Sequence, residues 1–272
     1  MKKMNFTKMV ASGNDFVVVS GGLKLGAQGL SNLAKNACDR KFGVGADGML
    51  VLEKSRVADA RMRIFNADGS EAEMCGNGAR CAVLYISRSS SVFRCSSKHS
   101  IQTKAGIILY ELKGDNIKIK LTDPKGIRMD IPVAINDRSL RINFINTGVP
   151  HAVVFVSGID AIDVPGLGRE IRYHQEFAPA GTNVDFVEII GDNVLRVRTY
   201  ERGVEDETLA CGTGSVASAI IYALKADTSK MINVSTAGGE VLKVYFARSH
   251  ERINNVWLEG RAKVVYTGVY NV

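Results

Sequence analysis

The pattern that most constrains this chain is a Cys-Gly-x-Gly unit found once in each half. The copies are Cys75-Gly76-Asn77-Gly78 and Cys211-Gly212-Thr213-Gly214, half a chain length apart in 272 residues. Each copy follows a β-favouring run and a turn, and each leads into apolar residues at helical spacing. The pattern therefore predicts two similar halves, each with a cysteine at the N-terminus of a helix.

That position gives a cysteine special chemistry. The free N–H groups and the positive dipole end of a helix stabilise a thiolate and can also hold a carboxylate. Two thiols on opposite faces of one carbon, one removing a proton and one delivering a proton, would suit a racemase or epimerase. The backbone N–H groups of Gly76, Asn77, Gly212 and Thr213 would then stabilise the charge that develops on a substrate carboxylate.

Other recurrences favour the same division into halves. A glutamate lies four residues before each cysteine, an Asp-Phe-Val run behind an asparagine occurs twice, and a similar tetrapeptide precedes a hairpin in both halves. The pairs are Glu71 and Glu207, 15–17 and 185–187, and 103–106 and 235–238.

Many short strands separated by turns, one principal helix per half and few parallel βαβ units indicate an α+β fold. We expect two pseudo-symmetric domains, over residues 1–124 and 125–272, although the C-terminal strand could return to the first. Residues 123–138, with two prolines and a glycine, are predicted to form a loop-rich connector. Because ligands favour domain interfaces, the active site is expected in the cleft between the domains. Helices are expected over 28–38 and from residue 75, and strands over 49–52, 60–66, 100–103, 105–112, 116–121, 141–146 and 152–156.

Composition excludes several classes of protein. The chain is 46% hydrophobic and 23% charged, as in an ordinary soluble globular protein. Its net charge is +7, but lysines and arginines are scattered, so no nucleic-acid partner is expected. The N-terminus lacks the apolar core of a signal peptide and no apolar run could span a bilayer, which predicts a cytoplasmic protein without a membrane partner.

The five cysteines are unevenly spaced and include no CxxC pair. They are expected to be free thiols, with Cys38, Cys81 and Cys95 as small buried hydrophobic residues. No metal site and no cofactor are expected; in particular, no glycine-rich phosphate loop accompanies a lysine suited to pyridoxal phosphate. A thiol redox or metal-binding module built on Cys75 and Cys211 is the alternative from another functional class.

Three further side chains could serve the two thiols. His151, after a Val-Pro pair, could help to deprotonate a thiol, or could be a capping or packing residue. Glu201 could act likewise on the opposite side or neutralise a substrate ammonium. Arg202 suits bidentate binding of a carboxylate, with a surface ion pair as the alternative.

The chain resembles the cofactor-independent diaminopimelate epimerases over nearly its whole length. Cys-Gly-x-Gly alone is a weak signal, but the matching motifs together are highly specific. In order they are Gly13-Asn14-Asp15-Phe16, Asn66-Ala67-Asp68-Gly69-Ser70, Cys75-Gly76-Asn77-Gly78-Ala79-Arg80, Gly148-Val149-Pro150-His151, Gly181-Thr182-Asn183-Val184, Tyr200-Glu201-Arg202-Gly203 and Ala210-Cys211-Gly212-Thr213-Gly214.

The resemblance implies two similar domains, each a half-barrel of strands around a central helix. It implies interconversion of LL- and meso-2,6-diaminoheptanedioate, a small dicarboxylate amino acid, for lysine and peptidoglycan synthesis. Cys75 and Cys211 would be the base and acid pair, assisted by His151 and Glu201. The implied substrate contacts are Asn14, Asn66, Asn183, Glu201 and Arg202, with the backbone amides of Gly76, Asn77, Gly212 and Thr213. A homodimer is also expected.

Two residues depart from the family pattern. Many members carry Gln where this chain has Gly48, and Asn where it has Val149. Each change removes a polar side chain, so a second substrate such as glutamate could be tolerated. Proline and hydroxyproline racemases also use a pair of cysteines. The Glu201-Arg202 pair favours a dicarboxylate substrate instead, because proline has no second carboxylate to bind.

Overall fold

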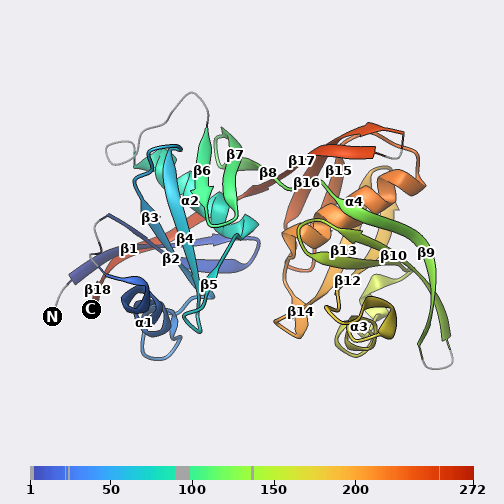
Figure 1. Cartoon of the computed structure of the whole chain (residues 1–272), viewed down its shortest axis with the longest axis horizontal. Coiled ribbons are helices and arrows are strands. Elements are labelled where there is room, and N and C mark those ends of the chain that lie inside the picture. The colour runs from blue at the N-terminus through green and yellow to red at the C-terminus, as the bar shows by residue number, and fades with distance from the viewer. Residues whose placement is uncertain (1–2, 22, 24, 90–98, 136–137, 251) are drawn as a thin grey trace. The chain divides into compact units, whose positions relative to one another are not determined.

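The computed structural model describes residues 3–21, 23, 25–89, 99–135, 138–250 and 252–272. The chain divides into two compact units (Figure 1). Unit 1 is Met1–Ile119 with Gly260–Val272, and unit 2 is Lys120–Glu259. The division that the sequence suggested, at residue 124, falls slightly later along the chain. The final strand belongs to unit 1, the possibility that the sequence left open.

The two units share an order of helices and strands that runs from β1 to β8 in unit 1 and from β10 to β17 in unit 2. In unit 1 they are β1 (Lys3–Ala11), β2 (Asn14–Ser20), α1 (Ala27–Cys38), β3 (Gly48–Glu53), β4 (Ala60–Asn66), β5 (Glu71–Ala72), α2 (Gly76–Arg88), β6 (Ser100–Thr103), β7 (Gly106–Lys113), β8 (Asn116–Lys120) and β18 (Lys263–Asn271). In unit 2 they are β9 (Lys125–Ile135), β10 (Arg138–Asn146), β11 (Pro150–Phe155), α3 (Val164–Arg172), β12 (Asn183–Gly191), β13 (Val194–Glu201), β14 (Asp206–Thr208), α4 (Gly212–Lys225), β15 (Ile232–Thr236), β16 (Val241–Ser249) and β17 (Arg252–Arg261).

Strand pairing confirms two similar strand-rich α+β domains but corrects the predicted connections. In unit 1, β2 is parallel to β3 and β4 is parallel to β6. In unit 2, β11 is parallel to β12 and β13 is parallel to β15. Each of the four α-helices in the described part of the chain connects one of these pairs. The expectation of few parallel βαβ units was therefore wrong, because the many antiparallel hairpins obscured these crossovers.

Helix α3 was absent from the prediction, which gave each half one principal helix. Its start carries recognisable signals: the side chain of Asp163 accepts a hydrogen bond from the Gly166 N–H at 3.1 Å, and a proline occupies the first turn. The Asp-Phe-Val recurrence was also misleading. It lies on β2 in unit 1 and on β12 in unit 2, whereas the order of elements matches β2 with β11.

The predicted connector over residues 123–138 is mostly strand β9, which pairs with β10. Proline and glycine indicated a loop, but strand β9 accommodates them because its hydrogen-bond ladder with β10 is irregular. Asp130 adopts a φ of +52° and Gly126 a φ of +63°, and the register shifts on either side of Phe144. Pro132 lies opposite Arg141 within the ladder. The prediction was wrong because a bulged strand accepts residues that usually end one.

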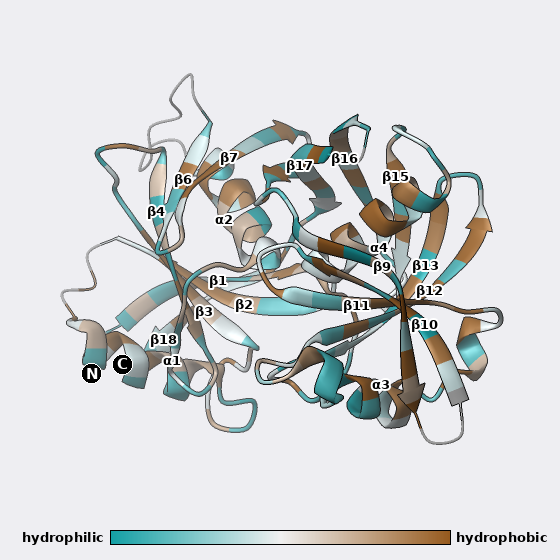
Figure 2. Ribbon diagram, turned by 45° about the vertical axis from the view of Figure 1, so that its right-hand side comes forward, coloured by the Kyte–Doolittle hydropathy of each residue, from teal (hydrophilic) through white to brown (hydrophobic). Residues whose placement is uncertain are grey.

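The helices that begin at the two cysteines lie in the interior of their units. Every residue of α4 from Gly214 to Ala223 is buried, and the helix packs against β10 to β13, β15 and β16. Helix α2 is similarly enclosed, against β1 to β4. Figure 2 shows α4 mostly in the hydrophobic brown, whereas teal residues interrupt α3. A helix that is apolar all round needs such enclosure, which fixes where its N-terminus lies.

Cys38 behaves as the predicted buried hydrophobic residue, and its titration gives a test. It lies at the end of α1 in the core of unit 1, 2% exposed, and burial raises the pKa of its thiol to about 11. In the unfolded chain this thiol ionises at its ordinary pKa of 9.0, whereas in the folded protein it stays protonated to a higher pH. The contribution of Cys38 to the free energy of unfolding is therefore complete below pH 9.0 and is lost as the pH rises through about 11. We expect Cys38→Ala to lose about 1 kcal/mol less stability than the wild type between pH 7 and pH 10.

Urea unfolding of both proteins at the two pH values measures this difference. Equal alkaline losses would contradict the expected role of Cys38. Cys81 is also fully buried, whereas Cys95 lies outside the described residues.

Candidate active site

In unit 1, Cys75 is the N-cap residue of α2. Its Sγ accepts a hydrogen bond from the Gly78 N–H at 3.4 Å, the arrangement that favours a thiolate at a helix N-terminus. The same Sγ lies 3.8 Å from Oδ1 of Asn14, which begins β2. Two residues that the sequence assigned to the site, 61 positions apart, thus come together in unit 1.

A network of charges holds Asn14 in place. Its Nδ2 donates to Oδ2 of Asp47 at 2.8 Å, which directs its Oδ1 towards Cys75. Arg40 bridges Asp47 and Asp15, and Lys8 pairs with Asp15 at 2.7 Å. Burial alone would raise the pKa of Asp15, but hydrogen bonds from Lys8 and Arg40 lower it to about 2. Asp47 therefore fixes the direction of the Asn14 amide.

The other unit 1 candidates lie on the same two elements or beside them. Asn77 is in the first turn of α2, where its Oδ1 accepts a hydrogen bond from Arg80. Asn66 ends β4 and donates to Oγ of Ser70 at 2.9 Å. The backbone N–H groups of Gly76 and Asn77 belong to the first turn, where helices leave N–H groups without an intrahelical partner.

In unit 2, Cys211 caps α4 in the same way, accepting from the Gly214 N–H at 3.4 Å. Its Sγ also lies 3.4 Å from Oγ1 of Thr213. Unlike the half-buried Cys75, Cys211 is only 9% exposed. Burial, followed by the negative charges of Glu201 and Asp185, raises the pKa of this thiol well above its ordinary value. At neutral pH, Cys211 is therefore a protonated thiol.

His151 connects this thiol to a buried carboxylate. Its Nε2 lies 3.0 Å from Oγ1 of Thr213, and its Nδ1 lies 2.7 Å from Oδ2 of Asp185. Both His151 and Asp185 are fully buried, and Thr199 donates to the other oxygen of Asp185 at 2.8 Å. The result is a continuous chain from Cys211 through Thr213 and His151 to Asp185. The carboxylate selects the tautomer with a proton on Nδ1, which leaves Nε2 free to accept a proton.

Glu201 and Arg202 lie at the end of β13. Burial raises the pKa of Glu201, although Thr208 donates to its Oε2 at 3.0 Å. The backbone N–H of Arg202 donates to Oδ1 of Asn183 at 2.8 Å, and Asn183 Nδ2 donates to the Pro150 carbonyl at 3.1 Å. Unit 2 thus gathers the predicted His151, Asn183, Glu201, Arg202, Cys211, Gly212 and Thr213.

Sequence reasoning missed Asp185, Thr199 and Thr208. A signal for Asp185 was present: Asn183 and Asp185 are two residues apart on β12, so they project from the same face. Nothing local distinguished the two threonines from ordinary strand residues.

The two departures from the family pattern have different structural settings. A Cβ added at Gly48 would lie 2.8 Å from the carbonyl oxygen of Phe65, so this backbone has no room for a longer side chain there. Val149 is half-buried in the turn before β11.

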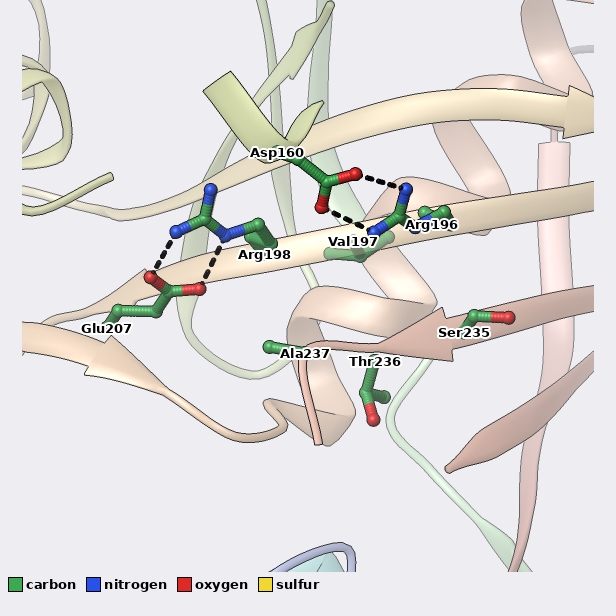
Figure 3. A pocket seen from close by; sticks show the side chains of 8 residues that line it. All are labelled: Asp160, Arg196, Val197, Arg198, Glu207, Ser235, Thr236 and Ala237. Atoms are coloured by element: carbon green, nitrogen blue, oxygen red, sulfur yellow. Dashed lines mark hydrogen bonds and ion pairs between the residues drawn. The ribbon is translucent and has the colours of Figure 1, made fainter. Parts of the chain in front are cut away.

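The repeated glutamates before the cysteines serve the strands. Glu71 pairs with Arg63 at 2.7 Å, joining β5 to β4, and Glu207 pairs with Arg198 at 2.6 Å, joining β14 to β13. Figure 3 shows the second pair beside a cavity in unit 2, where Arg196 is held by Asp160 in the same manner. Because carboxylates occupy both arginines, this cavity is a poor candidate for binding an anionic substrate.

Within the described part of the chain, no cluster of three or more His, Cys, Asp or Glu side chains could hold a metal ion. The helices described are also too short, or insufficiently apolar, to cross a membrane.

The sequence model of the family described as diaminopimelate epimerase matches residues 6–126 and 143–265. A diaminopimelate epimerase from Methanocella arvoryzae is 42% identical, covering 100% of this chain and 98% of that protein. Another, from Caldanaerobacter subterraneus, is 40% identical over 97% of this chain and 98% of its own length.

Solved structures support the fold. A phenazine biosynthesis protein of the PhzF family from Bacillus anthracis superposes with a TM-score of 0.76 at 20% identity, covering all of both chains. A hydroxyproline epimerase from Agrobacterium vitis superposes with a TM-score of 0.70 at 15% identity, over 98% of this chain and 92% of the other. At these identities the likeness shows the fold alone. The match to the family model and the full-length relatives near 40% identity decide the narrower question: this chain belongs to the diaminopimelate epimerase family.

Proposed function

We propose that this chain interconverts LL- and meso-2,6-diaminoheptanedioate, with Cys75 and Cys211 as its base and acid pair. The observation that carries the proposal is the matched setting of the two thiols. In each unit the Sγ of a cysteine accepts an N–H from the first turn of an enclosed helix, and two glycines follow the cysteine in that turn. Family membership supplies the substrate.

In the proposed reaction, the thiolate of one cysteine removes the α-hydrogen of the substrate as a proton. The electron pair of the broken C–H bond moves into the adjacent carboxylate, and the thiol of the other cysteine delivers a proton to the opposite face. The first-turn amides of Gly76, Asn77, Gly212 and Thr213 would bind the charged carboxylate, a contribution of roughly 3 kcal/mol per donor in comparable sites. The reverse reaction exchanges the roles of the two cysteines.

The setting of Cys211 supports its role as the acid when Cys75 is the base. Its raised pKa keeps the proton on sulfur until the carbanion forms. When the reaction runs the other way, Cys211 must lose this proton. Thr213 and His151 offer the route by which it leaves, and Glu201, whose raised pKa also makes it a better base, lies close enough to interact with His151.

Asn14, Asn66, Asn183 and Arg202 are the proposed contacts to the rest of the substrate, and Glu201 is suited to its ammonium group. The position of the substrate between the two units, the cytoplasmic location and the homodimer stay predictions. Glutamate also stays a hypothesis, which circular dichroism of L-glutamate incubated with the enzyme would decide.

The proposed function is tested by incubating the enzyme with LL-diaminoheptanedioate in D₂O, with EDTA and without pyridoxal phosphate. We expect deuterium at one α-carbon and formation of the meso isomer, because the thiols exchange protons with solvent between turnovers. Mass spectrometry and chiral chromatography measure the two products. If no meso isomer forms above the level of a Cys75→Ala control, the proposed function is wrong, and a redox or metal-binding role of the thiols becomes the better explanation.

A further inference from the structure

Asp47 is not among the proposed catalytic residues, yet one side chain, that of Asn14, joins it to Cys75. Asp47 ends the loop between α1 and β3, and its backbone N–H donates to Oδ1 of Asp15 at 2.9 Å. In return, Oδ2 of Asp47 accepts the Asp15 backbone N–H at 3.1 Å and Nδ2 of Asn14 at 2.8 Å. These reciprocal hydrogen bonds hold the Asp47 carboxylate against the start of β2.

Ion pairs anchor the same carboxylate from the other side. Nη2 of Arg40 donates to Oδ1 of Asp47 at 2.6 Å and to Oδ1 of Asp15 at 2.9 Å. The side chain of Lys8 is only 8% exposed and pairs with Oδ2 of Asp15 at 2.7 Å. Asp47 is therefore held by residues of β1, β2 and the end of α1, although its own side chain is partly exposed to solvent.

This carboxylate decides which end of the Asn14 amide faces Cys75. An ionised carboxylate has no hydrogen to donate, so Asn14 can turn only its NH₂ group towards Asp47. The Oδ1 of Asn14 is then the atom that lies 3.8 Å from Sγ of Cys75. Because this oxygen can only accept, a hydrogen bond between the two side chains requires the proton to be on sulfur. An amide that was free to turn could instead offer its NH₂ group to the thiolate.

Two contacts at Sγ of Cys75 thus act in opposite directions. The Gly78 N–H, which donates to Sγ at 3.4 Å, stabilises the thiolate. The Oδ1 of Asn14 stabilises the thiol, since a hydrogen bond made only by the protonated form disfavours ionisation. The proposed reaction needs both forms of Cys75, the thiolate when it removes a proton and the thiol when it delivers one.

We propose that Asp47 is a positioning residue for this reaction: it holds the oxygen of the Asn14 amide towards Cys75 and so preserves the thiol form of Cys75 against the pull of the helix N-terminus. The inference rests on the proposed function, since it concerns the proton of the same cysteine. Its distinguishing property is that the amide cannot turn when the sulfur ionises.

A double-mutant cycle of Asp47→Ala and Asn14→Ala tests this property. Iodoacetamide alkylates the thiolate, and mass spectrometry of the peptide that contains Cys75 gives its alkylation rate across a range of pH. We expect Asp47→Ala to lower the pH midpoint of this reaction by about one unit, because the released amide can donate to the thiolate. The acidic limb of kcat/KM, for the isomer that Cys75 deprotonates, should move equally. In the Asn14→Ala background, Asp47→Ala should leave the midpoint unchanged.

The cycle separates the turn of the amide from the loss of a charge. The other charged side chains around α2 are the same in both pairs of proteins, so their effects cancel; they include Lys8 on β1, Asp15 on β2, Arg40 before β3, Arg63 on β4, Glu71 on β5 and Arg80 on α2. Asp39→Ala is the matched control. It removes the same charge from the same loop, but Asp39 accepts from the backbone N–H groups of Lys41 and Phe42. We expect it to leave the midpoint of Cys75 unchanged.

Three results would overturn the inference: an unchanged midpoint in Asp47→Ala, an equal shift in the Asn14→Ala background, or an equal shift in Asp39→Ala. Alkylation needs no substrate. A wild type that does not epimerise would therefore overturn the proposed function, while the control of Cys75 by Asp47 would still stand or fall on the midpoints.

Melting temperatures show whether the variants are folded. Should Asp47→Ala unfold, NMR of the Asn14 side-chain amide in the wild type decides the question. Hydrogen exchange of this amide that stays slow when Cys75 ionises supports a fixed amide, since its bond to Asp47 persists. Exchange that becomes faster on ionisation shows that the amide turns, and the inference is then wrong.

Discussion

Replacing either catalytic cysteine with alanine is expected to abolish epimerisation and yet leave hydrogen exchange with one isomer. Loss of the acid or the base should reduce epimerisation about 10³-fold or more, since a positioned group of this kind contributes about 10² to 10⁴. The remaining thiolate still lies on one face of the α-carbon. It can remove a proton from the isomer whose hydrogen faces it and return deuterium to the same face.

Cys211→Ala and Cys75→Ala should therefore exchange opposite isomers, one LL and the other meso. NMR of each pure isomer in D₂O with each variant gives the four rates. Exchange should be faster in Cys211→Ala, because the remaining Cys75 is half-buried and meets solvent more readily than the 9% exposed Cys211. If both variants exchange the same isomer, or neither exchanges any, the two cysteines do not act on opposite faces of one carbon.

Local pattern was sufficient to predict the position of both thiols. A strand, a turn, Cys-Gly-x-Gly and an apolar run at helical spacing leave little choice about where the helix begins, and Cys75 and Cys211 are indeed the N-cap residues of α2 and α4. The structure adds that both helices are enclosed by strands.

The partner of His151 could not be predicted in the same way. Asp185 reaches His151 only because β11 and β12 pair in parallel, with His151 opposite Asn183. Helix α3 is part of the connection between these two strands. Because no helix was predicted at α3 and few parallel crossovers were expected, there was no strand register from which to derive this contact. Gly48 illustrates a second limit: its missing side chain suggested a lost polar contact, whereas the neighbouring Phe65 carbonyl leaves no room for one.

The row of hydrogen-bonded side chains from Cys211 to Asp185 leads to the second prediction with a large effect on activity. We expect Asp185→Asn to lower kcat about 10²-fold with little change in KM. The amide has the shape of the carboxylate, but it can donate to Nδ1 of His151 and so favour the tautomer protonated on Nε2, which cannot accept a proton from Thr213. The carboxylate of Asp185 packs tightly against the backbone of Gly214: a Cβ added at Gly214 would lie only 2.3 Å from Oδ1 of Asp185. A side chain longer than aspartate at position 185 is therefore not a useful substitute. The ¹⁵N shifts of His151 report the tautomer directly.

Thr213 distinguishes a proton relay from mere support of the histidine ring. Thr213→Val removes the hydroxyl that lies 3.4 Å from Cys211 and 3.0 Å from His151 but keeps the backbone amide and the side-chain shape. In a Cys75→Ala background, where Cys211 alone exchanges the substrate hydrogen, Thr213→Val should slow that exchange about 10-fold or more, and Thr213→Ser should restore part of it. In a Cys211→Ala background the same change should have little effect, because Cys75 then does the exchange and does not use Thr213. Equal effects in the two backgrounds would show that Thr213 only shapes the site, and the proton of Cys211 would have to leave by way of Glu201 instead.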